Sequence, residues 1–113
     1  MKFWCFHFEG VFTKESLEYP EEGVFSSCLT TSENYVDAEF NFLKALLERK
    51  IDLIEISDCF PVNTDEIDLK EKENFYWIQR CEETERAGKP TFEVFDLYPK
   101  EEVPHKRYLK DFA

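Results

Sequence analysis

The sequence predicts an α+β domain, with one sheet of roughly four mainly antiparallel strands and two helices packed on one face, in the order ββαβαβ. Three observations predict this fold. Two apolar, β-rich segments, 3–8 and 23–30, come before any helical pattern. Apolar residues at helical spacing then appear twice, within 31–50 and 67–87. Finally, 113 residues with 42% hydrophobic content suffice for one core, so we expect a single domain over 1–113.

The two leading strands enclose a polar loop. Segment 3–8 has apolar side chains on both faces, which is typical of a central strand, and we expect it to extend to Phe12. Segment 13–22 is polar and acidic, with Pro20 as a turn signal. Segment 23–30 therefore predicts a second strand, antiparallel to the first.

The first helix follows directly after the second strand. Its start is marked by residues that are competent N-caps: Thr31, Ser32 and Asn34. The face that we expect to be buried carries apolar side chains at four-three-four spacing: Val36, Phe40, Leu43 and Leu47. Ala38, Phe42 and Leu46 are expected to flank this stripe. Arg49 and Lys50 suit the negative end of the helix, which closes at 48–50.

A buried strand is predicted at 51–57, because this segment is β-branched and apolar at its centre. The stretch 61–65 breaks the pattern. The second helix should cover most of 67–87, with Phe75, Ile78 and Cys81 turned inward. Gly88 is its expected stop signal.

The chain closes with an edge strand and a tail. Segment 91–98 interleaves acidic and apolar residues, and charge at an edge discourages unwanted pairing. We expect 99–113 to be an extended C-terminal tail with a short helical turn at 108–112. The apolar start of the chain, stopped by His7 and Glu9, is expected to be a strand and not a signal peptide.

Four cysteines are spread irregularly along the chain, at Cys5, Cys28, Cys59 and Cys81. Each lies among apolar neighbours in a predicted strand or helix. A domain of this size does not need a disulfide framework, although the even count allows one. We therefore expect buried free thiols in a reducing cytoplasm.

The charge of the chain is its strongest functional signal. The sequence holds 25 acidic against 14 basic residues, a formal net charge of -11. Such a protein is repelled by nucleic-acid phosphates and by anionic lipid, which argues against both as direct ligands. It also lacks an apolar stretch long enough for a membrane span. A negative field of this strength favours a basic protein partner.

The acidic residues cluster in the 13–22 loop and on the polar face of the second helix. A charged face can serve solubility alone; the functional alternative is a surface that steers a cationic partner. Tyr19, Tyr76, Trp77 and Tyr98 lie near these acids as candidate aromatic anchors. We predict that partner-binding residues come from this set: Glu18, Glu21, Glu22, Asp65, Glu66, Asp68, Glu71, Glu73, Trp77, Glu82, Glu83 and Glu85.

Two constellations offer chemistry in place of binding. Cys5 and His7 project from one face of a strand, an arrangement that suits a nucleophile with its base or half of a zinc site. The alternative, which we favour, is a partly buried thiol and imidazole in an aromatic-rich central strand. The acidic stretch between Asp58 and Asp68 offers oxygen ligands for a hard cation but lacks the pattern of the twelve-residue calcium loop. Phosphate-loop and hydrolase signatures are absent from the sequence. We therefore expect a protein without cofactor, metal or catalytic residues.

In general character the chain is similar to the small acidic immunity proteins that bacteria produce together with their toxins. The resemblance rests on size, charge and α/β composition, and no family motif accompanies it. It implies a cytoplasmic inhibitor, a monomer or weak dimer, whose carboxylates occlude the active site of a basic, nuclease-like toxin domain. The alternatives are a small enzyme or ligand-binding domain with a pocket near Cys5 and His7, and an acidic mimic of nucleic acid.

Overall fold

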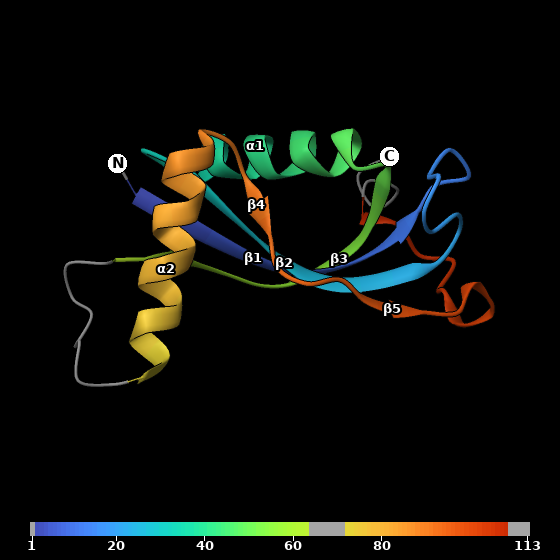
Figure 1. Cartoon of the computed structure of the whole chain (residues 1–113). Coiled ribbons are helices and arrows are strands. Elements are labelled where there is room, and N and C mark those ends of the chain that lie inside the picture. The colour runs from blue at the N-terminus through green and yellow to red at the C-terminus, as the bar shows by residue number, and fades with distance from the viewer. Residues whose placement is uncertain (1, 64–71, 109–113) are drawn as a thin grey trace.

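The computed structural model describes residues 2–63 and 72–108 and shows an antiparallel sheet with two helices (Figure 1). Its strands are β1 (Lys2–Phe12), β2 (Gly23–Ser32), β3 (Ile51–Val62), β4 (Thr91–Phe92) and β5 (Asp96–Tyr98). They lie in the order β3-β1-β2-β4, and β5 pairs with β2 as β4 does, at a different place along that strand. The predicted α+β class, the element order and the mainly antiparallel sheet are confirmed.

The predicted edge strand at 91–98 is broken into β4 and β5. β4 pairs with Cys28 and Leu29, whereas β5 pairs with the start of β2 at 23–25. Between them, the Ser26 hydroxyl donates to the carbonyl of Glu93 at 3.0 Å. The backbone N–H of Glu93 donates to the carbonyl of Ser27 at 2.9 Å, so this segment stays attached to β2 between the two strands.

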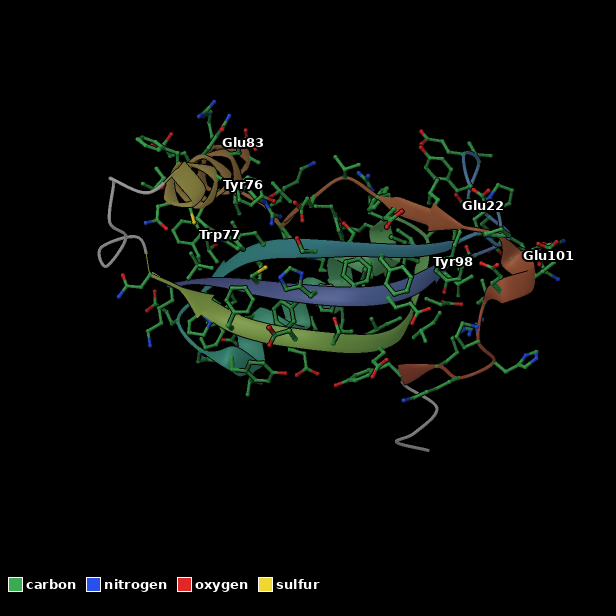
Figure 2. All side chains as sticks on the ribbon, turned by 90° about the horizontal axis from the view of Figure 1, so that it is seen from below. Glu22, Tyr76, Trp77, Glu83, Tyr98 and Glu101 are labelled. Carbon is green, nitrogen blue, oxygen red and sulfur yellow. The ribbon has the colours of Figure 1, made fainter. Side chains whose placement is uncertain are left out.

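α1 (Tyr35–Glu48) packs over one face of the sheet, whereas α2 (Lys72–Ala87) stands at the β2 edge and covers one end of the opposite face (Figure 1 and Figure 2). Side chains alternate along β1, so that Phe6 and Phe8 enter the core under α1. Cys5 belongs instead to a second, smaller cluster with Cys81 of α2. The structure thus differs from the expected packing of both helices on one face. A central strand with two apolar faces satisfies this arrangement, because each face needs its own cover.

The buried face of α1 is not the predicted stripe. Its buried residues are Ala38, Phe42, Ala45 and Leu46. Val36, Phe40 and Leu47 are 74%, 67% and 70% exposed, so their predicted burial is wrong, and only Leu43 is partly buried. The two alanines leave room for the helix to approach the sheet, and Phe42 fills the space between them. The predicted cap is confirmed at Asn34, whose Oδ1 accepts from the backbone N–H of Asp37 at 3.0 Å.

α2 contacts the sheet through a mixed apolar and polar face. Cys81 is buried as predicted, but Phe75 is 58% exposed, so its predicted inward orientation is wrong. Arg80 and Thr84 are buried in its place. The Thr84 hydroxyl donates to the Arg80 carbonyl at 2.9 Å, which satisfies it within the helix. Gly88, with φ of +67°, ends α2 as predicted.

The four cysteines are free thiols. Three are buried, and Cys59 is half-buried at the α1 face. Within residues 2–63 and 72–108, none of the helices has the length and apolar character that crossing a membrane requires. Tyr108, near the end of the described tail, packs against the core under α1, so the tail is anchored there.

Candidate partner-binding surface

The second helix is held on the sheet by aromatic packing at one end of the molecule. Trp77 is half-buried and packs against the cluster of Cys5, Leu29 and Cys81. Its ring meets Phe60 of β3 edge-on, with centroids 5.8 Å apart. The predicted anchor Trp77 is thus largely a packing residue. The more exposed aromatic side chains of this helix are its neighbours Phe75 and Tyr76, at 58% and 41% exposure.

A buried arginine fixes the helix further. Arg80 is only 7% exposed, and its guanidinium lies 5.9 Å from the ring centroids of both Tyr76 and Trp77. Its Nη1 donates to Ser27 Oγ of β2 at 2.9 Å, whereas its Nη2 is buried without a hydrogen-bond partner. Burying this cation costs free energy unless a negative charge compensates it, and Ser27 connects the guanidinium to a carboxylate through hydrogen bonds.

Glu93 is that carboxylate. Its Oε2 accepts from the Ser27 hydroxyl at 2.9 Å, and its Oε1 accepts from the Tyr76 hydroxyl. The Tyr76 hydrogen bond is the main cause that lowers the pKa of Glu93 below its ordinary value, aided by Ser27 and Arg80. Desolvation, and then the bond to Glu93, raise the pKa of Tyr76. Tyr76, Arg80, Ser27 and Glu93 therefore form one polar network, which we call the α2 anchor.

Part of the predicted acidic set lies on this anchored helix. Glu82, Glu83 and Glu85 are all exposed. Phe75 and Glu82 are seven residues apart, as are Tyr76 and Glu83, so each pair lies on one side of the helix two turns apart. The outer surface of α2 therefore combines exposed carboxylates with the exposed ring of Phe75 and with Tyr76, which is partly exposed although its hydroxyl is bonded to Glu93.

The structure does not bring the remaining described acids to this helix. Glu22 lies near Tyr98 and Glu101 at the far end of the sheet from Glu83 (Figure 2). Glu18 is exposed and Glu22 is half-buried. Glu21 forms an ion pair with Lys100, with 3.6 Å between Oε2 and Nζ. The two predicted acidic groups thus occupy opposite ends of a molecule whose long extent is 43 Å.

Several predicted residues cannot be placed. Asp65, Glu66, Asp68 and Glu71 lie outside the described residues, and the side chain of Glu73 is not described. Two members of the candidate cation stretch are placed: Asp58, which accepts from the backbone N–H of Cys59 at 2.9 Å, and Asn63. In the part of the chain that the structure describes, no three His, Cys, Asp or Glu side chains form a group suited to a metal ion.

Cys5 and His7 do lie together, with 3.9 Å between Sγ and Nε2. The thiol is fully buried, however, and burial raises the pKa of Cys5 to about 11. A nucleophilic cysteine needs a lowered pKa and access to its substrate. The geometry of this pair therefore favours a packed thiol over a catalytic one.

The α2 anchor was missed by sequence reasoning. Its helical members, Tyr76 and Arg80, lie four residues apart, so they occupy one side of α2 one turn from each other. This polar spacing within an otherwise amphipathic helix was the available signal. Ser27 and Glu93 carry no comparable signal, because both are distant in sequence from Arg80.

Comparison with protein-family models, with curated proteins and with solved structures finds no significant match to this chain.

Proposed function

We propose that this protein is a binding and inhibitory protein for a basic partner, and specifically an immunity protein that neutralises a nuclease-like bacterial toxin in the cytoplasm. The observation that carries the proposal is the outer surface of α2. Glu82, Glu83 and Glu85 are exposed on the same helix as the exposed rings of Phe75 and Tyr76, and Glu82 and Glu83 lie two turns from those rings. Charge and aromatic anchors on one surface are the combination that fast, tight protein association uses.

The proposed mechanism is occlusion of a cationic active site. A nuclease must present positive charge to hold phosphates, so an anionic inhibitor gains in both association rate and affinity. The α2 anchor supports this role because it holds the helix in place before binding. A pre-organised surface loses less conformational entropy when its partner docks.

The 13–22 loop has a different part in this proposal. Its Glu22 lies at the opposite end of the sheet from Glu83 (Figure 2). In this proposal the acids of the loop contribute to the long-range field and therefore to steering, while contact is made by α2. This division makes the two groups separable by mutation.

The test uses the protein and the basic product of its adjacent gene, mixed in stopped flow at about 50 and 500 mM salt, a range over which exposed charges become strongly screened. The α2 variant replaces Glu82, Glu83 and Glu85 by Lys. The control variant replaces Glu18, Glu22 and Glu101 by Lys, which changes net charge equally at the other end of the molecule.

We expect the α2 variant to associate at least about tenfold more slowly at low salt, with a flatter salt dependence and with loss of nuclease inhibition. The control should retain inhibition and lose only the part of the rate that net charge supplies. Equal losses of association rate and inhibition in both variants would mean that net charge alone causes the effect. An unchanged association rate in the α2 variant would mean that the outer surface of α2 is not the binding surface.

A further inference from the structure

The outward face of α1 carries an apolar stripe that the fold leaves largely exposed. Val36, Phe40 and Leu47 are each at least two-thirds exposed, and the half-buried Leu43 completes their four-three-four spacing. In Figure 1, α1 forms the outer layer on its side of the sheet, with α2 crossing elsewhere. Contiguous apolar patches on a protein surface often mark the place where a partner binds.

The charges beside the stripe indicate what binds it. Asp37 and Lys44 are both exposed and lie seven residues apart, so they occupy the same flank of α1 two turns from one another. The acid is near the start of the helix and the base near its end. If a second α1 ran antiparallel along this face, its Lys44 would meet Asp37 and its Asp37 would meet Lys44.

The geometry points to a second copy of this chain as the occupant, packed through α1 about a two-fold axis. The same reversal places Val36 opposite Leu47 and Phe40 opposite Leu43. Every side chain of the stripe then has an apolar partner, and the polar flank has two ion pairs. A self-complementary patch of this kind is what an isologous dimer requires.

The size of the face sets the strength of the dimer. The helix has 14 residues and is therefore roughly 21 Å long, so it supplies an interface near the lower limit of about 1,000 Å² for a specific contact. The net charge of -11 on each copy opposes association. We therefore infer a concentration-dependent dimer.

Sedimentation velocity on the full chain from about 5 to 500 μM tests this, since that range brackets a weak dissociation constant. The expected result is a shift from the 13.6 kDa monomer to twice that mass as concentration rises. Phe40→Asp should abolish the shift. Val94→Asp is the matched control, because Val94 is 86% exposed outside α1 and acquires the same charge. Circular dichroism checks that both variants fold.

A charge swap tests the antiparallel register. Asp37→Lys and Lys44→Asp should each weaken the dimer, because each places like charges opposite one another. Mixed together, the two variants should pair with one another, since every contact across the axis is again between opposite charges.

Three outcomes would overturn the inference. One is a monomer at every concentration, and another is a wild-type dimer that survives Phe40→Asp. The third is a monomeric full chain that dimerises once residues 109–113 are deleted, which would make the chain's own end the occupant of the stripe.

Discussion

The ring of Phe42 in α1 stacks on the ring of Phe6 in β1, with centroids 4.5 Å apart and planes 6° from parallel. Phe8 approaches the same ring at 5.3 Å. All three side chains are almost completely buried. The contact determines which side of α1 faces the sheet, because the alanines at 38 and 45 allow the helix close enough for the rings to stack.

Replacing Phe42 by Ala should therefore lower the free energy of unfolding by about 3–5 kcal/mol, the range for deletion of a buried aromatic ring. Phe40→Ala, two residues away and 67% exposed, should change it by no more than about 0.5 kcal/mol. Urea unfolding at dilute concentration measures both. Similar losses in the two variants would contradict the observed orientation of α1.

The α1 helix shows where sequence reasoning ends. Its existence, its Asn34 cap and its place after β2 follow from local signals, as does the antiparallel character of the sheet, whereas the order of the strands in the sheet does not. Its buried side does not, because apolar residues surround much of the helix and two stripes fit the same periodicity. The choice between them depends on packing against Phe6, a contact that sequence spacing does not contain.

The ring of Tyr98 leaves room only for a glycine at position 23, at the start of β2. Tyr98 lies directly over Gly23, in the space that a Cβ would fill, while its hydroxyl donates to Glu9 Oε2 and its ring packs at 5.2 Å from Phe25. Gly23→Ala should therefore destabilise the fold by about 1–3 kcal/mol through overpacking.

A double-mutant cycle checks the cause. In a Tyr98→Ala background the added methyl group has room, so Gly23→Ala should cost much less there. An equal loss of stability in both backgrounds would mean that contact with the Tyr98 ring is not the cause. Thermal unfolding of the four proteins gives the comparison.

The hydroxyl of Tyr76 should control the acidity of Glu93. Because this hydrogen bond is the largest cause of the lowered pKa, Tyr76→Phe should raise the Glu93 pKa toward its ordinary value of 4.5. Glu93 stabilises the fold fully above that value, and the contribution is lost as pH falls through its lower folded pKa. NMR titration of the Glu93 carboxyl in wild type and variant measures the shift. An unchanged pKa would assign the effect to Ser27 and Arg80.

The thiols should be slow to react while the protein is folded. Burial raises the pKa of Cys5, Cys59 and Cys81 to about 11 and that of Cys28 to about 12. A rise from 9.0 to about 11 lowers the thiolate fraction at pH 8 by roughly a hundredfold. A disulfide reagent should therefore modify native protein at least about a hundredfold more slowly than unfolded protein. Rapid modification of Cys5 in native protein would instead support the nucleophile alternative.

Part of the candidate site can be predicted from the sequence, whereas the burial of Arg80 in the α2 anchor cannot. The exposed acids at Glu82, Glu83 and Glu85 are evident from helical spacing. Arg80, in contrast, is a charged residue that composition alone assigns to the surface. Its burial depends on Ser27 and, through Ser27, on Glu93, and these partners become neighbours only when the sheet forms.

Removing the Arg80 side chain should loosen α2 without unfolding the domain. Arg80→Ala deletes the buried bulk of this side chain together with the donor to Ser27 and the cation over two rings, so we expect a loss of about 1–3 kcal/mol, concentrated in this helix. Amide hydrogen exchange should accelerate in α2 and stay unchanged in α1, because the two helices pack on separate clusters.

Two variants serve as controls. Arg86→Ala changes an exposed arginine in the last turn of α2. Arg80→Met, which keeps the bulk and removes the charge, should retain most of the protection, since apolar replacements of buried ions are often neutral. Uniform acceleration in both helices of the Arg80→Ala variant would mean that α2 unfolds only with the whole domain.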